Sequence, residues 1–199
     1  MTDVATLILA AGRGTRFGAA PKLLALLDGK PLVRRAAEAA LAARPRPVVA
    51  VLGAHADPVE AALVGLNLRL VRNEAYADGL STSLKKGISA LPPGCEAAIV
   101  MLGDMPLVSA DLIDCLADAF VRAGSKPAAV IPVHAGRRGN PILLNLRLLG
   151  EDIAGLQGDR GAGPLLSGRT DLLEVEGDAS TTLDIDTPEA LAELTTPRM

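Results

Sequence analysis

Basic residues and glycines crowd one short segment that follows an apolar run near the start of the chain. Residues 9–22 read LAAGRGTRFGAAPK and contain three glycines, two arginines and a lysine. Glycines let backbone N–H groups approach an anion, and each charge-assisted hydrogen bond to a phosphate contributes about 1.5 to 3 kcal/mol. The segment therefore predicts a phosphate-binding loop with Arg13, Arg16 and Lys22 as its cations. The competing interpretation is a tight turn whose cations are solvated.

This loop departs from two common phosphate-binding motifs. The dinucleotide fingerprint G-x-G-x-x-G needs a third glycine at the position of Phe17, and the glycine comes one residue late. The P-loop motif fails because no Gly-Lys-Ser/Thr follows the first glycine at the required distance. The loop therefore predicts a nucleotide site of another type.

Two further segments place aspartates after short apolar runs. Asp104 follows AAIVML in the segment LGDMP, and Asp184 and Asp186 lie in DIDTP near the end of the chain. Mg²⁺ is usually bound by one or two carboxylates together with substrate phosphates and water. The spacing thus favours Asp104 and Asp186 as metal ligands. For Asp186, capping of the following helix remains an alternative.

Composition excludes several classes of partner. The 199 residues carry a net charge of only −3, and the three aromatic residues are too few for stacking on single-stranded nucleic acid. No apolar run reaches the 18 residues of a membrane span, and the start of the chain is not typical of a signal peptide. Cys95 and Cys115 have no metal-ligand spacing. We expect a cytoplasmic protein without a nucleic acid or membrane partner.

Apolar runs and helical patterns alternate along the chain. Strands are expected at 5–10, 47–53, 68–73, 97–102 and 128–133, and helices at 31–43, 57–64, 80–91, 109–123 and 187–196. Such alternation predicts an α/β fold: a doubly wound, mostly parallel sheet between two helical layers, a three-layer αβα arrangement. Ligands of these folds bind outside the carboxyl ends of the strands, where the glycine loop and Asp104 are expected.

The character of the sequence changes after residue 135. Eight of the 20 glycines fall between Gly136 and Gly168. We interpret this region as mobile or closely packed backbone that forms the second half of a cleft. We therefore predict one domain over 1–199, with a nucleotide-binding half at about 1–110 and an acceptor-binding half at about 111–199.

Five motifs, taken together and in this order, resemble those of a known family. LAAGRGTRFG followed by PK, then GLSTSL, LGDMP, GRRGNP and DIDTP, are similar to motifs of the MobA-like nucleotidyltransferases, most closely the molybdenum cofactor cytidylyltransferase (MocA-type) branch. The resemblance extends from Leu7 to about Leu194, and Phe17 departs from the methionine of many relatives. It implies a Rossmann-like nucleotidyltransferase fold and transfer of a nucleotidyl group from an NTP to a phosphate acceptor, with release of pyrophosphate.

The resemblance also assigns roles to residues. It implies that Lys22 and Arg16 hold the triphosphate and act in catalysis with Asp104, and that Asp104 and Asp186 bind Mg²⁺. The nucleotide-binding set is Leu9, Ala10, Ala11, Gly12, Arg13, Gly14, Thr15, Arg16, Lys22, Asn73, Gly79, Ser81, Ser83 and Asp104. For the acceptor we predict His134, Arg137, Arg138 and Asn140, with solvated loop charge as the alternative for the two arginines.

The expected activity is transfer of CMP from CTP to the phosphate of molybdopterin. In the resembling family, cytidylyltransferases tend to carry AAG where guanylyltransferases carry AGG, and this chain has Ala11. A guanylyltransferase or sugar-phosphate nucleotidyltransferase is the first alternative, and a non-catalytic protein that binds a nucleotide or delivers the molybdenum cofactor is the second. A molybdoenzyme or its chaperone is the expected protein partner. No protein nucleophile is needed, so His55 is expected to be a solvated or satisfied histidine.

Overall fold

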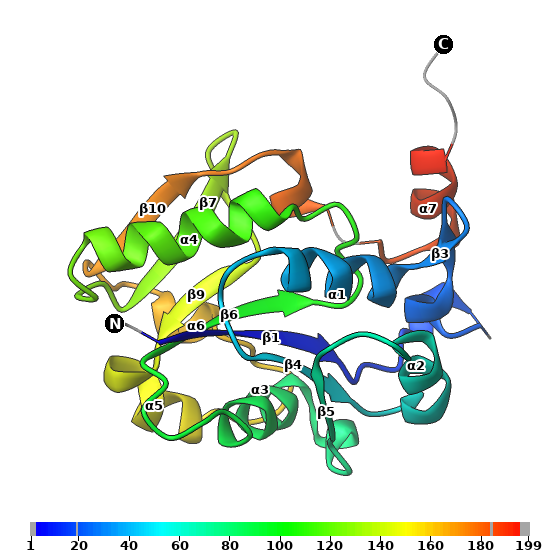
Figure 1. Ribbon diagram of the computed structural model, residues 1–199, viewed down its shortest axis with the longest axis horizontal. Helices are drawn as coiled ribbons and strands as arrows, with labels where there is room; N and C mark the ends of the chain where they lie inside the picture. Colours follow the sequence, from blue (N-terminus) through cyan, green and yellow to red (C-terminus); the bar gives the residue numbers. More distant parts are fainter. Residues whose placement is uncertain (1–2, 19, 184, 196–199) are drawn as a thin grey trace.

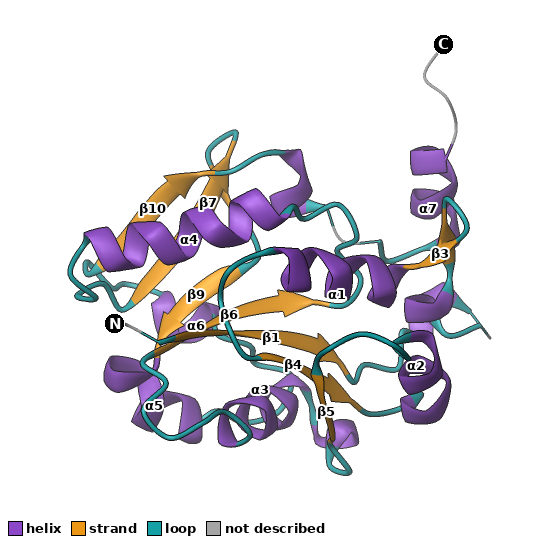
Figure 2. Cartoon of the chain, in the orientation of Figure 1, coloured by secondary structure: helices purple, strands orange, loops and turns teal. Residues whose placement is uncertain are grey.

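A computed structural model describes residues 3–18, 20–183 and 185–195 of the chain. Within these ranges eight strands form one sheet in the order β10-β7-β9-β6-β1-β4-β5, with β8 paired to β7 (Figure 2). The strands are β1 (Val4–Ala10), β4 (Val48–Leu52), β5 (Arg69–Arg72), β6 (Ala97–Leu102), β7 (Ala129–His134), β8 (Arg137–Arg138), β9 (Ile142–Asn145) and β10 (Leu172–Glu176). A separate hairpin joins β2 (Leu26–Leu27) to β3 (Lys30–Pro31). The five strands predicted from the sequence are present and parallel.

Helices cover both faces of this sheet, as Figure 1 shows. Apolar residues of α1, α2 and α4 pack on one face, and those of α3, α5 and α6 on the other. The helices are α1 (Leu32–Ala42), α2 (Ala56–Ala62), α3 (Leu80–Ser89), α4 (Ala110–Arg122), α5 (Leu146–Ala154), α6 (Gly163–Leu166) and α7 (Pro188–Thr195). The doubly wound, three-layer prediction is therefore confirmed.

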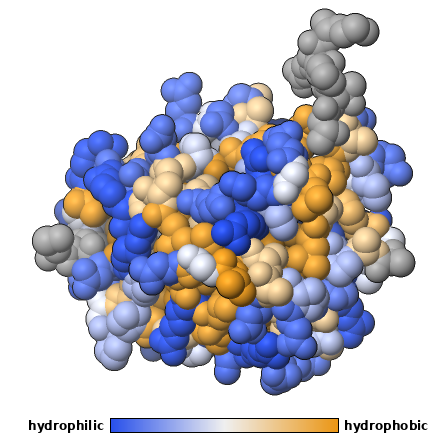
Figure 3. Space-filling model, turned by 45° about the vertical axis from the view of Figure 1, so that its right-hand side comes forward, coloured by the Kyte–Doolittle hydropathy of each residue, from blue (hydrophilic) through white to orange (hydrophobic). Residues whose placement is uncertain are grey.

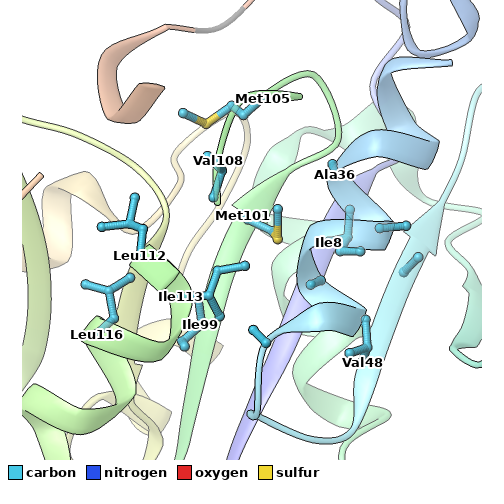
Figure 4. Packing of buried hydrophobic residues seen from close by; sticks show 14 of the residues in the cluster. Ile8, Ala36, Val48, Ile99, Met101, Met105, Val108, Leu112, Ile113 and Leu116 are labelled. Atoms are coloured by element: carbon cyan, nitrogen blue, oxygen red, sulfur yellow. The ribbon is translucent and has the colours of Figure 1, made fainter. Parts of the chain in front are cut away.

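The largest core lies between the sheet and helices α1 and α4. Ile8, Ile99 and Met101 project from neighbouring strands towards these helices, where they meet Ala36 and Ile113 (Figure 4). All five are fully buried. Strands buried on both faces need continuous apolar runs, which explains why the short runs of the sequence identify them.

Two helices begin with a side-chain cap. The Ser109 side chain accepts a hydrogen bond from the backbone N–H of Leu112 (3.2 Å) at the start of α4. Thr187 Oγ1 accepts one from the N–H of Ala190 (3.2 Å), with Pro188 in the first turn of α7. Such side-chain caps satisfy N–H groups that have no partner inside the helix.

The glycine-rich second half contains a strand that its composition did not indicate. β9 (Ile142–Asn145) is fully buried and lies antiparallel between β6 and β7. It has only four residues between a hairpin and a helix, too few for a periodic signal. The segment before Asp186 contains a 3₁₀ turn, Ala179–Thr182.

A small satellite core fixes the C-terminal segment beside the glycine loop. Ile185 is fully buried with Phe17, Leu27 and Leu32, and Leu191 of α7 packs against this group. Figure 1 shows α7 next to β3, and Figure 3, which turns this side forward, shows hydrophobic surface broken by polar side chains. The cluster therefore places residue 186 beside the loop that follows β1.

No helix within the described ranges is long and apolar enough to cross a membrane.

Candidate active site

A cleft of about 510 Å³ opens where β1, β4, β5 and β6 end. Because these strands are parallel, the loops that follow them meet at one edge of the sheet. The cleft is lined by Leu9, Ala11, Gly12, Arg13, Gly14, Thr15, Lys22, Leu23, His55, Tyr76, Ala77, Gly79, Leu80, Ser83, Leu102, Asp104 and Asp159. Most of the nucleotide-binding residues predicted from the sequence thus lie on one surface.

The glycine loop folds back so that its two ends touch. Gly14 has φ of 61°, and a Cβ placed on it would lie 2.9 Å from Cβ of Lys22. A side chain at position 14 would therefore be strained and would push against Lys22. Two 3₁₀ turns, Thr15–Phe17 and Lys22–Leu24, flank this contact. Phe17 of the first turn is buried in the satellite core, and this packing fixes the position of the loop.

Lys22 joins the two aspartates that the sequence singled out separately. Its Nζ contacts Oδ2 of Asp104 and lies 2.7 Å from Oδ1 of Asp186. Arg16 Nη1 lies 2.9 Å from Oδ2 of Asp186. Placement of Asp186 depends on the satellite core and on a hydrogen bond from the backbone N–H of Ile185 to the carbonyl of Asp104 (3.2 Å). The tertiary structure therefore brings together residues more than 160 positions apart.

Burial differs strongly within this charge cluster. The side chains of Lys22 and Asp104 are 12% and 14% exposed, whereas those of Asp186 and Arg16 are 40% and 79% exposed. Burial alone would lower the pKa of Lys22, but hydrogen bonds and charge attraction from Asp104 and Asp186 outweigh it and raise that pKa. The hydrogen bond from Lys22 in turn lowers the pKa of Asp186. Both groups are therefore charged at neutral pH.

Asp104 retains an unused coordination position. Its Oδ1 is buried and has no hydrogen-bond partner among the described residues. A buried carboxylate oxygen without a partner is costly, and a divalent cation would satisfy it. No group of three acidic, histidine or cysteine ligands occurs in the described part of the chain, so the donor set fits Mg²⁺ shared with substrate phosphates rather than a closed metal cage. Asp184 lies outside the described residues.

Several predicted nucleotide contacts lie behind the cleft wall. Asn73 is buried, and its Nδ2 donates to Oγ1 of Thr82 (2.9 Å) and Oγ of Ser83 (3.0 Å). Ser81 is fully buried, and Ala10 is nearly so. Neither these two residues nor Asn73 line the cleft, whereas Gly79 and Ser83 do. Asn73 holds the start of α3 in place, and its direct contact with a nucleotide stays a prediction.

The cleft also contains residues that the motifs missed. Tyr76 and His55 lie beside the glycine loop: the guanidinium of Arg13 sits 5.8 Å from the ring centroid of Tyr76, and His55 Nε2 lies 3.4 Å from the carbonyl of Arg13. Both follow the carboxyl end of a strand, so the strand-end rule is the signal that would have found them. Asp159 comes from the glycine-rich second half and carries no local signal.

The predicted acceptor residues form a second group on the β7–β8 hairpin and after it. Arg138 pairs with Glu174 (2.8 Å), Arg137 is exposed, and His134 Nδ1 lies 3.2 Å from the carbonyl of Gly177. The backbone N–H of Asn140 donates to the carbonyl of Thr181 (2.7 Å). None of the four is among the described residues that line the cleft. They share its edge of the sheet, because β7 runs parallel to β6.

Comparison with known proteins assigns the chain to a family. The MobA-like NTP transferase domain matches residues 6–175, a span that includes the cleft, the glycine loop and Asp104. The chain belongs to the MobA-like NTP transferase family. This membership confirms the resemblance drawn from the five motifs.

The chain is similar to three proteins with different names and lengths. Rv0371c from Mycobacterium tuberculosis H37Rv superposes with a TM-score of 0.84 at 26% identity over 98% of both chains, and it has also been crystallised with manganese. Nicotine blue oxidoreductase from Paenarthrobacter nicotinovorans is 32% identical over 96% of both chains. Bifunctional protein GlmU from Sorangium cellulosum is 34% identical over 65% of this chain. The chain spans less than a third of the GlmU proteins it matches.

Proposed function

We propose that this chain is a divalent-metal-dependent nucleotidyltransferase that transfers CMP from CTP to the phosphate of molybdopterin and releases pyrophosphate. The observation that carries the transferase proposal is the buried Lys22–Asp104 pair on the cleft wall, with Asp186 beside it and Oδ1 of Asp104 free to bind a cation. In this proposal residues at about 1–110 form most of the nucleotide site, and residues at about 111–199 hold the acceptor and contribute Asp159 to the cleft and Asp186 to the charge cluster. Mg²⁺ is the proposed metal and the cytoplasm the proposed location.

The reaction needs charge neutralisation more than proton transfer. An acceptor phosphate is already anionic at neutral pH, so its oxygen attacks the α-phosphorus without a protein base. One P–O bond forms as the bond between the α-phosphorus and the bridging oxygen breaks, and the electron pair leaves with pyrophosphate. Lys22 and Arg16 offset the growing negative charge, and the glycine loop provides backbone N–H groups for phosphate oxygens. Asp104 and Asp186 would hold a divalent cation, which would supply further positive charge near the phosphates.

The choice of substrates rests on one cleft residue and on the motifs. CTP is proposed because Ala11 lines the cleft, and molybdopterin because of the MocA-like motifs. The alternatives are GTP, or a sugar phosphate as acceptor. A molybdoenzyme or its chaperone would receive the product.

Pyrophosphate release tests this proposal directly. The purified protein is assayed with each of four NTPs against molybdopterin and against a panel of sugar phosphates, with Mg²⁺ or Mn²⁺. Release that requires CTP, molybdopterin and metal is expected. Nucleotide binding without release for any pair would instead support the non-catalytic binding or delivery role.

The nicotine blue oxidoreductase match favours a second candidate function, that of an oxidoreductase. That match covers 96% of both chains, which is more than the GlmU matches cover. The test is oxidation of NADH or NADPH by quinone-like acceptors. The loss of absorbance at the nicotinamide band measures this oxidation. Turnover there, without pyrophosphate release from any NTP, would replace the transferase proposal.

A further inference from the structure

One carboxylate in the cleft has no partner in the described part of the chain. Asp159 lines the cleft, is exposed, and makes no side-chain hydrogen bond or ion pair with any described residue, whereas Asp104 and Asp186 both contact Lys22. It comes from the loop between α5 and α6, about 55 residues after Asp104 in the sequence. A lone acidic group in an anion-binding cleft calls for a ligand of different chemistry from phosphate.

Close backbone contacts hold this loop against the start of α3. The carbonyl of Gly158 accepts a hydrogen bond from the backbone N–H of Ser81 (3.1 Å), and the carbonyl of Leu156 accepts one from Nζ of Lys85 (2.9 Å). Gly79 has φ of 108°, and a Cβ on it would lie 2.2 Å from the carbonyl carbon of Gly158. Only glycine permits this approach, so the two segments are built to meet. Asp159 is therefore held at the cleft wall by the residues that precede it.

Asp159 and the charge cluster around Lys22 lie on opposite sides of the sheet. Leu23, next to Lys22, packs in the core with α1 and α4, whereas Leu156 and Ala162 pack in the core with α3 and α5. A nucleotide with its phosphates at Lys22 and Arg16 would turn its nucleoside part towards the other wall. Leu80 and Ala77 line that wall beside Asp159 and provide apolar contact.

We infer that Asp159 is a specificity-determining residue that accepts a hydrogen bond from the nucleoside part of the bound NTP. Repulsion between like charges disfavours a direct contact with phosphate, whereas a carboxylate readily accepts hydrogen bonds from neutral O–H and N–H donors. A nucleoside offers two such donors, the ribose hydroxyls and an exocyclic amine of the base. This inference rests on the proposed function, because it requires a nucleotide in the cleft.

The test compares CTP with one nucleotide that lacks the 2′-hydroxyl and one whose base carries a carbonyl oxygen in place of the exocyclic amine. Calorimetric titration with Mg²⁺ and without acceptor measures Kd for CTP, dCTP (no 2′-hydroxyl) and UTP (no amine), for the wild type, Asp159→Ala and Asp159→Asn. GTP, dGTP and ITP form the same series for a guanine nucleotide. Asp111→Asn, an exposed acidic residue in the first turn of α4, is the matched control.

Asp159→Ala is expected to weaken CTP binding about tenfold, because a hydrogen bond to a charged group is lost. If the 2′-hydroxyl is the donor, the variant loses the preference for CTP over dCTP and keeps that over UTP; if the amine is the donor, the reverse holds. If the 3′-hydroxyl is the donor, the variant binds all three nucleotides more weakly by the same factor. Asp159→Asn keeps one acceptor oxygen and should fall between the two, which preserves the test if the alanine variant does not fold. Unchanged or tighter binding of all three nucleotides by both variants would overturn the inference. A wild type that binds no NTP would overturn the proposed function with it.

Discussion

Two groups of charged residues lie at the same edge of the sheet, and they differ in how the fold surrounds them. Lys22 and Asp104 are largely buried at the cleft, where three segments distant in sequence converge on one ammonium group. Arg137 and Arg138 stand exposed on a two-residue strand, and the second already pairs with Glu174. Charges that are desolvated together interact strongly, whereas exposed pairs contribute about 0 to 1 kcal/mol. We therefore expect substitutions in the first group to matter far more than those in the second.

The largest effect is expected at Asp104. Asp104→Asn retains the shape of the side chain but removes the charge, and kcat for pyrophosphate release should fall at least about 100-fold, or about 2.7 kcal/mol. Steady-state assays at saturating Mg²⁺ measure this, and thermal unfolding checks that the fold persists. Turnover close to wild type would falsify the assignment of Asp104 as the main metal ligand.

The second-largest effect on turnover is expected at Lys22. Lys22→Ala removes the charge that acts on the leaving pyrophosphate, and kcat should fall about 30-fold, or about 2 kcal/mol. Lys22→Arg should not restore it, because a planar guanidinium does not fit between two carboxylates as an ammonium does. Separate measurement of kcat and KM decides the role: a change in KM alone would mean that Lys22 holds only the ground state.

A binding experiment without nucleotide separates Lys22 from the metal ligands. Because its ammonium occupies both carboxylates, Lys22→Ala should bind Mn²⁺ more tightly than the wild type, by about threefold to tenfold. Electron paramagnetic resonance of free Mn²⁺ measures this, with Asp104→Asn as the control that should bind less. Weaker Mn²⁺ binding by Lys22→Ala would mean that the lysine orders the carboxylates rather than competes for them.

Asp186 should show an intermediate effect because it is more exposed than Asp104. Asp186→Asn is expected to lower kcat about tenfold and to raise the Mg²⁺ concentration needed for half-maximal activity. Since Lys22 lowers the pKa of Asp186, its contribution to folding stability should be present above the usual aspartate pKa and be lost as pH falls through the lowered value. A variant that melts earlier but keeps its Mg²⁺ requirement would favour a structural role at the start of α7.

The base preference tests a subtler contact. We expect CTP to be preferred over GTP by about tenfold or more in kcat/KM, because the Ala11 methyl narrows the space for a purine. Ala11→Gly should reduce this preference for CTP over GTP by only a few-fold, since the Ala11 methyl is nearly buried. This methyl packs closely against Gly53, where an added Cβ would lie 2.7 Å from it. Competition between the two nucleotides at fixed acceptor and Mg²⁺ measures the ratio. A GTP preference in the wild type would remove the cytidylyl proposal and leave the transferase proposal intact.

The smallest effects are expected on the β7–β8 hairpin. Arg137→Ala should raise KM for the acceptor about threefold, and Arg138→Ala by less, because Arg138 is already paired with Glu174. Neither should change the KM for CTP. Equal and unchanged KM values for the acceptor in both variants would support the interpretation of solvated loop charge.

The sequence by itself determined the alternation of elements, the glycine loop and the types of residue that carry the chemistry. Buried parallel strands must be continuously apolar, and phosphate binding needs glycines and cations close together, so both leave local signals. For the same reason, the sequence alone is enough to identify residues 9–22 and Asp104 as candidate site residues.

Only the tertiary structure decided which of these residues meet. Asp186 joins Lys22 because Ile185 is buried beside Phe17 and bonded to the Asp104 carbonyl, and Asp159 enters the cleft because Gly79 allows Gly158 to approach. The Asn73 side chain is buried rather than exposed to the cleft, because its amide donates hydrogen bonds to the hydroxyls at the start of α3. Contacts between distant segments depend on packing and on hydrogen bonds that no local pattern records, which is why the convergence of charges could not be predicted from spacing alone.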